Sequence, residues 1–163
     1  MDSLAMAIPL GVGATALIDL WALARRRLFG IAPPNWGLVG RWIGHMPRGR
    51  FVHDSIAAAP QVRGEPVIGW TAHYLIGIAY AAILLVAAGA AWLEQPTPGP
   101  AFLVGIGTVV APFFLMQPGM GLGIAASRAP HPASVRLHSL VTHLLFGLGL
   151  YLGGLALRLP DAP

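Results

Sequence analysis

Four polar residues lie inside long apolar stretches of this sequence, where an ionisable or amide side chain is costly. They are Asp19, His73, Gln117 and His143. An aspartate at the centre of a membrane helix costs roughly 2.5–3.5 kcal/mol on insertion scales, so such residues need a partner, water or a ligand. Counted from the arginine-rich ends of their stretches, all four fall at a similar depth. We therefore expect one polar site to which four helices contribute.

Two of these residues have a spacing that suits a cofactor. His73 and His143 are each followed by a glycine four positions later, at Gly77 and Gly147. Imidazole is a common axial ligand of haem iron, and a glycine one turn along the helix leaves room for the porphyrin. A b-type haem held by His73 and His143 is therefore one candidate. A divalent metal ion held by Asp19, His73 and His143 is another, because imidazole and carboxylate groups bind zinc and iron.

Two further interpretations of these residues stay open. In the first, they line a path for a proton or a small solute, since ionisable groups inside a membrane often do so. In the second, they form hydrogen bonds that only join neighbouring helices. The second interpretation assigns them no chemistry.

Four further polar residues complete the candidate site, three of them outside the apolar stretches and one, His138, at the very start of the last stretch. They are His53, Asp54, Arg128 and His138. His53, Asp54 and Ser55 are the residue types of a hydrolase triad, but adjacent positions rarely give a triad its geometry. The glycine-rich segment 118–123, followed by Arg128, favours a tight turn or backbone contacts to a lipid headgroup. His138 is expected at the membrane interface. These patterns leave open whether the protein is an enzyme.

The elements that position these residues are helices covered by lipid. Of 163 residues, 56% are apolar and 10% are charged, and the mean hydropathy is +0.69. A soluble domain carries roughly 25% charged residues. The net charge of +4 comes from arginines that long apolar runs separate, which argues against nucleic acid as a partner. The sequence has no cysteine, which excludes disulfides and thiol chemistry.

Four apolar stretches are long enough to cross a bilayer, which needs about 20 residues in a helix. They are residues 4–23, 67–92, 101–117 and 137–157. Prolines separate the second stretch from the third and precede the fourth. The sequence predicts an all-α fold, namely an integral membrane four-helix bundle that forms a single polytopic domain over residues 1–163.

The arginines predict the orientation of this bundle. Nine of the ten lie in segment 25–66 or between the third and fourth stretches. Basic loops stay on the cytoplasmic side, so both termini and the loop with Glu94 are expected in the periplasm. The polar site then lies in the cytoplasmic third of the membrane.

The first cytoplasmic loop, residues 25–66, contains a predicted helix. Apolar residues recur at helical spacing from Trp36 to Met46, and Asn35 is a suitable N-cap. Its tryptophans and arginines favour an interfacial amphipathic helix that contacts anionic lipid headgroups. An irregular loop is the alternative, because glycines weaken a helix.

Two pairs of segments resemble each other. Ala72–Ala79 and Thr142–Gly149 both read small–His–x–Leu–large–Gly–aliphatic–small, and Gly11-Val12-Gly13 parallels Gly105-Ile106-Gly107. These matches indicate two parallel two-helix repeats, related by an axis normal to the membrane. Chance is the alternative, since glycine and leucine are abundant in membrane helices.

A set of loop motifs carries a resemblance to a known family. The motifs are Asn35-Trp36-Gly37, Gly40-Arg41-Trp42, Arg50-Phe51-Val52-His53-Asp54-Ser55, Gly69-Trp70 with His73-Tyr74, Gln117-Pro118-Gly119-Met120-Gly121 and Ala125-Ala126-Ser127-Arg128. With these, the whole chain resembles small bacterial membrane proteins catalogued as a domain of unknown function, family 2938. The resemblance implies a bacterial inner (cytoplasmic) membrane protein of this size and helix number, and it implies no activity, cofactor or catalytic residue.

Together these patterns predict a membrane protein that binds a small ligand or cofactor at a buried His/Asp/Gln site. The alternative is a non-catalytic accessory subunit of a larger membrane complex, or a small proton or solute carrier. In the accessory subunit, glycine-rich faces would pack against a partner protein or a second copy of the chain. These faces carry Gly147, Gly149, Gly153 and Gly154.

Overall fold

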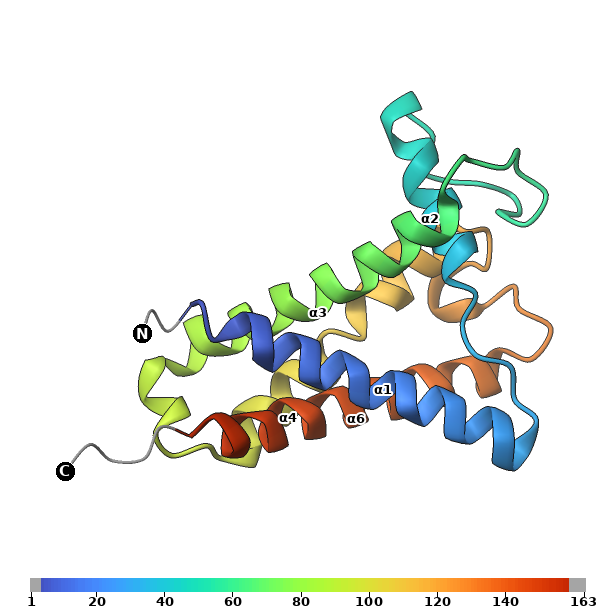
Figure 1. Ribbon diagram of the computed structural model, residues 1–163. Helices are drawn as coiled ribbons and strands as arrows, with labels where there is room; N and C mark the ends of the chain where they lie inside the picture. Colours follow the sequence, from blue (N-terminus) through green and yellow to red (C-terminus); the bar gives the residue numbers. More distant parts are fainter. Residues whose placement is uncertain (1–3, 159–163) are drawn as a thin grey trace. The chain divides into compact units, whose positions relative to one another are not determined.

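The computed structural model describes residues 4–158 as an all-α chain (Figure 1). Within these residues, four helices are long and apolar enough to cross a membrane, at residues 7–29, 65–88, 98–119 and 132–157. The predicted all-α class and the four long apolar helices are therefore confirmed. The elements in chain order are α1 (Ala7–Phe29), α2 (Trp36–His45), η1 (Met46–Arg48), α3 (Glu65–Ala88), η2 (Ala90–Leu93), α4 (Pro98–Gly107), η3 (Pro112–Met116), α5 (Gln117–Gly119), η4 (Ile124–Ala126) and α6 (Pro132–Leu157).

Capping residues and prolines set the ends of the long helices. Helix α1 continues through the arginine triplet and stops at Gly30, whose left-handed φ of 66° suits a glycine C-cap. Arg26 and Arg27 lie in its last turn, where the helix dipole favours cations. Helices α4 and α6 begin at Pro98 and Pro132, because the first turn of a helix has no N–H bond for a proline to remove.

The third span is not one regular helix, although the sequence predicted one. Helix α4 ends at Gly107, and the hydroxyl of its C-cap residue Thr108 donates to the Gly105 carbonyl at 2.7 Å. The next element, η3, is a π-helix, in which the Gln117 N–H bonds to the carbonyl of Pro112. Pro112 and Pro118 lack N–H groups and cannot continue an α-helical ladder, which explains the break.

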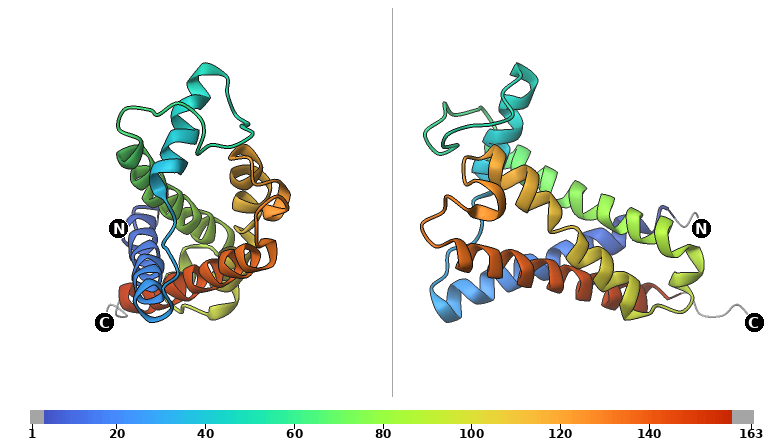
Figure 2. Two further views of the ribbon diagram at one scale, coloured as in Figure 1. Left: turned by 90° about the vertical axis from the view of Figure 1, so that its right-hand side faces the viewer. Right: turned by 180° about the vertical axis from the view of Figure 1, so that it is seen from behind.

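The described chain forms two compact units. Unit 1 comprises the residues up to Pro33, Tyr74–Thr108 and the residues from Val141 onward, and unit 2 comprises Pro34–His73 and Val109–Leu140. In unit 1, Leu10, Leu84 and Leu150 are completely buried. Figure 2 shows α1, in blue, beside the red C-terminal part of α6, where Gly149 of α6 abuts Ala14 of α1.

Glycines let the helices of unit 1 approach to backbone contact. A Cβ atom on Gly11 would collide with the backbone of Gly77 in α3, and one on Gly105 would collide with the backbone of Gly147 in α6. Helices α1 and α3 therefore cross at a glycine pair, and so do α4 and α6. The glycine-rich face of α6 packs against other elements of the same unit. Gly147 contacts α4, Gly149 and Gly153 contact α1, and Gly154 contacts Trp92.

Unit 2 is built around helix α2 and the loop that follows it. The Asn35 side chain accepts the Leu38 N–H at 3.4 Å, so the predicted N-cap is confirmed. A Cβ atom on Gly40 would overlap the Glu65 carbonyl, so this glycine permits α2 to cross the start of α3. The core of the unit is formed by Val39, Ile56 and Met120, against which Trp36, Trp42, Ile43 and Met116 pack.

Candidate functional site

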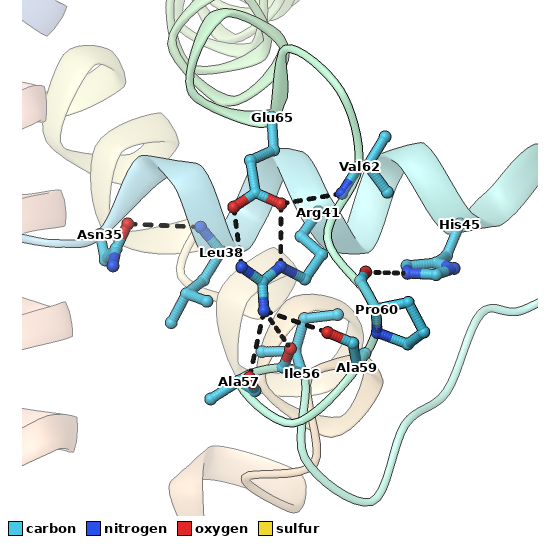
Figure 3. A network of polar contacts seen from close by, with 10 residues as sticks. All are labelled: Asn35, Leu38, Arg41, His45, Ile56, Ala57, Ala59, Pro60, Val62 and Glu65. Carbon is cyan, nitrogen blue, oxygen red and sulfur yellow. Dashed lines mark hydrogen bonds and ion pairs between the residues drawn. The ribbon is translucent and has the colours of Figure 1, made fainter.

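The most extensive polar network of unit 2 surrounds Arg41, a buried residue of α2 (Figure 3). Its Nε and Nη2 atoms both donate to the Glu65 carboxylate at 2.8 Å, which forms a bidentate ion pair. The hydrogen bond with Glu65 raises the pKa of Arg41 above its ordinary value. The third guanidinium nitrogen, Nη1, donates to three loop carbonyls, those of Ile56 at 3.4 Å and of Ala57 and Ala59 at 3.1 Å. One side chain thus joins α2, the start of α3 and the loop between them.

Two histidines lie next to each other in the same unit. His45 is 4% exposed, and its Nε2 lies 2.9 Å from the Pro60 carbonyl. The Nδ1 of His53 lies 3.4 Å from the Gly119 carbonyl. Since a carbonyl oxygen only accepts, these two nitrogens carry the protons. The other ring nitrogens, His45 Nδ1 and His53 Nε2, are buried and have no hydrogen-bond partner among the described residues. The ring centres are 5.1 Å apart.

His73 lies in an aromatic environment at the start of the second span. Its ring stacks on Trp36 of α2, with ring centres 3.8 Å apart and an angle of 24° between the planes. Trp70, one turn earlier in α3, contacts the same ring edge-on at 5.7 Å. His73 is 7% exposed. The stacking therefore orients the imidazole and covers one of its faces.

Gln117 follows the π-helix of the third span. The side chain is 3% exposed, its Nε2 lies 3.4 Å from the Ser139 hydroxyl, and its Oε1 has no partner within residues 4–158. Because the two ends of an amide are assigned from their hydrogen bonds, either orientation leaves one polar end without a partner. Buried side-chain groups of this kind are uncommon in native proteins.

The other two predicted residues of the spans lie in unit 1. Asp19 accepts the hydroxyl proton of Tyr74 at 2.9 Å. The Nδ1 of His143 lies 3.0 Å from the Thr108 hydroxyl and 3.2 Å from the Gly105 carbonyl, so this nitrogen donates and Nε2 is the acceptor of the neutral ring. Each polar side chain thus has a defined local orientation. The expectation that all four residues form one site stays a prediction.

The space beside the two glycines that follow the histidines is filled. A Cβ atom on Gly77 would meet Thr15 of α1, and one on Gly147 would meet Ala101 and Phe102 of α4. Both glycines therefore serve contacts between helices, and a haem held by His73 and His143 stays a prediction. Among residues 4–158, no group of three or more His, Asp or Glu side chains is close enough to hold a metal ion.

A family model described as "Protein of unknown function (DUF2938)" matches residues 8–157. The chain belongs to this family. The resemblance found in the loop motifs is thereby confirmed. Neither the curated proteins nor the solved structures contain a match to the chain.

The remaining predicted residues of this DUF2938 protein lie nearer the surface. Asp54 and Arg128 are exposed and His138 is half-buried. The backbone N–H of Arg128 donates to the Leu122 carbonyl at 2.8 Å, which closes the glycine-rich turn expected there. Ala125 and Ala126 in this turn have left-handed φ values of 48° and 57°.

The sequence did not indicate two features of the site. Arg41 and His45 belong to the helix for which the sequence predicts contact with lipid headgroups, but the structure buries both side chains. Glu65 is 24 positions from its partner Arg41, and no local pattern relates residues so far apart. The only sequence signal for the histidine pair is the short turn of Pro47, Arg48 and Gly49 between His45 and His53, which can bring the two residues back together.

Proposed function

We propose that this protein binds a small polar ligand through side chains buried in its spans, in the cytoplasmic third of a bacterial inner membrane. Gln117 carries the proposal. Its amide has an unpartnered polar end at 3% exposure, directly after a π-helix. Irregular π turns inside helices occur frequently at functional sites, and a polar group inside a membrane is a functional candidate by default.

The oriented residues of the other helices support the same proposal by their chemistry. Asp19 accepts the hydroxyl of Tyr74, and the neutral ring of His143 has an acceptor nitrogen besides the one that contacts Thr108. Ser139 offers a hydroxyl beside Gln117. Such groups suit a ligand that presents hydrogen-bond donors or a positive charge. We assign no reaction and no haem.

The alternative of an accessory subunit has lost its main argument. It rested on glycine-rich faces that would pack against partner helices. The four glycines concerned contact helices α1 and α4 or Trp92 of the same unit. The ligand-binding proposal therefore takes precedence.

Two architectural proposals accompany it. The crossings of α1 with α3 and of α4 with α6 use corresponding glycines, Gly11 with Gly77 and Gly105 with Gly147, which supports two parallel repeats. The tryptophans of α2 support a position in the cytoplasmic headgroup layer, although part of its apolar face packs within unit 2 and its one arginine, Arg41, is buried.

The function is tested by replacing Gln117 with leucine in the full chain. Leucine has a similar volume and no polar atoms, so it should leave the melting temperature unchanged or raise it. It should also remove any small molecule that native mass spectrometry detects on the purified wild-type protein. His131→Ala, at an exposed position outside the candidate site, is the control, and it should keep the bound molecule. A Gln117→Leu protein with undiminished ligand, or a wild type without any, would contradict the proposal.

A further inference from the structure

The paired histidines of unit 2 lie outside the candidate site in the spans. We propose that His45 and His53 form a binding site for one transition-metal ion of the zinc type. The inference does not depend on the proposed function, because neither residue lies in a membrane-spanning helix. It is based on the tautomers of the two rings, on the distance between the ring centres and on the burial of the nitrogens that carry no proton.

In both rings, the nitrogen that carries the proton leaves the other nitrogen available to a metal ion. A histidine that ligates a metal through one nitrogen commonly donates its other N–H to a backbone carbonyl, which fixes the tautomer. His45 has this arrangement with the Pro60 carbonyl at 2.9 Å, and His53 has it with the Gly119 carbonyl at 3.4 Å. Each ring therefore keeps one nitrogen with a free lone pair. The chain supplies no hydrogen-bond donor to either of these buried nitrogens within its described part.

The distance between the rings suits tetrahedral coordination. Metal–nitrogen bonds of about 2.0 Å at a tetrahedral zinc ion place the centres of two imidazoles about 5 Å apart. The observed centres are 5.1 Å apart and the planes meet at 61°. Because His45 is 4% exposed, its free nitrogen stays buried without a partner unless an ion or a water molecule reaches it.

The chemistry of the pair limits what the ion can be. Both ligands are neutral nitrogen donors, which favours zinc, copper, nickel or iron over magnesium or calcium. Two imidazoles leave further coordination positions open, as in sites where water or a small anion completes the shell. The carboxylate of Glu65 is already bound by Arg41 at 2.8 Å and is not counted as a ligand.

The test uses the full chain, purified in detergent with a tag that contains no histidine. After removal of metal by a chelator, Zn²⁺ is added and the bound ion is counted by elemental analysis, and Co²⁺ replaces it for absorption spectroscopy. We expect one Zn²⁺ per chain and the strong visible bands of tetrahedral Co²⁺. Protein that melts normally but binds no Zn²⁺ would overturn the proposal and leave a buried water as the partner.

Two substitutions keep the structural hydrogen bonds and remove the ligands. In His45→Gln the side-chain amide can still donate to the Pro60 carbonyl, and in His53→Asn it can still donate to the Gly119 carbonyl. Each should weaken Zn²⁺ binding by at least about tenfold, with a metal-free melting temperature close to that of the wild type. His131→Ala is the control and should bind Zn²⁺ normally.

A further pair of variants separates this site from the spans. His143→Ala and Gln117→Leu should leave Zn²⁺ binding intact, whatever their effect on the ligand of the spans. Zn²⁺ that persists in the His45→Gln, His53→Asn double variant but is lost in His143→Ala would overturn the inference in favour of the spans. These variants therefore show whether the metal-site proposal fails, independently of whether the ligand-binding proposal fails.

Discussion

The guanidinium of Arg41 donates hydrogen bonds to loop carbonyls that have no helix or strand to bond them. The loop carbonyls of residues 56, 57 and 59 point to one guanidinium, and buried carbonyls without a partner would destabilise the fold. Three guanidinium nitrogens are used at once, two on the Glu65 carboxylate and one on the loop. Lysine could not reproduce this, because its ammonium is a single point of charge without the planar fork of arginine.

Arg41→Lys should therefore loosen the loop while it keeps the charge. We expect a melting temperature lower by several degrees and faster cleavage of residues 49–62 by a nonspecific protease. Arg48→Lys is the matched control, since Arg48 is exposed in η1, directly after α2, and it should behave like the wild type. Equal protease resistance of Arg41→Lys and Arg48→Lys would show that the network does not hold the loop.

The sequence predicted a local contact such as the helix N-cap, whereas it did not predict most of the hydrogen-bond partners of the buried polar side chains. The N-cap at Asn35 follows from local chemistry and is confirmed, because its acceptor bonds a group three positions away. The burial of His45 and the pairing of Arg41 with Glu65 depend on contacts between segments far apart in sequence. Apolar periodicity says which face of a helix is buried, but not which polar groups are buried with it.

Among the elements, the glycine crossings and the broken third span determine where side chains lie. From the sequence, the glycines of segment 36–46 predict a weakened helix, whereas Gly40 makes room for the Glu65 carbonyl of α3. The prolines predict breaks before the third and fourth stretches, and Pro98 and Pro132 begin the helices that follow these breaks. The proline positions thus follow from local chemistry, whereas the role of Gly40 depends on packing between elements.

The crossings can be tested with neighbouring glycines of the same helix. Gly105→Ala should destabilise the protein by about 1–3 kcal/mol, because the new methyl group meets the backbone of α6. Gly107→Ala should be neutral or slightly stabilising, because nothing lies within 4 Å of its Cβ position. Unfolding in mixed detergent micelles would measure both. Similar stability of the two variants would argue against a close crossing.

The same comparison exists in the first half of the chain. Gly11→Ala should be destabilising to a similar extent, since its Cβ atom would collide with Gly77 and Ile78, and Gly13→Ala should not. Matching losses for Gly11→Ala and Gly105→Ala would support the two repeats. A clear loss in only one half would leave the sequence similarity without a structural counterpart.

For the whole molecule, the proposed orientation follows from the distribution of its arginines. Nine of the ten arginines lie in the two segments assigned to the cytoplasm, and basic loops resist transfer across the membrane. The absence of cysteine in the sequence makes the orientation easy to measure, because an introduced thiol has no background.

A single introduced cysteine should therefore react with a thiol reagent according to the side of the membrane on which it lies. In intact cells, a membrane-impermeant thiol reagent should modify Glu94→Cys and should not modify Arg50→Cys or Arg128→Cys. After the cells are permeabilised, all three should react, which controls for expression and accessibility. Protection of Glu94→Cys together with labelling of Arg50→Cys would reverse the orientation.

The guanidinium of Arg41 also predicts where the chain tolerates added residues. Three carbonyls within residues 56–59 must meet one nitrogen, so the spacing between them is fixed and an epitope inserted there would separate them. Gly49 and its neighbours are exposed, and exposed turns are the usual sites of tolerated insertion. A short epitope after Gly49 should thus leave expression and folding intact, whereas the same epitope after Ala57 should not. The exposed turn at Gly49 is therefore a suitable position for an affinity tag, whereas the segment 56–59 of the same loop must keep its length.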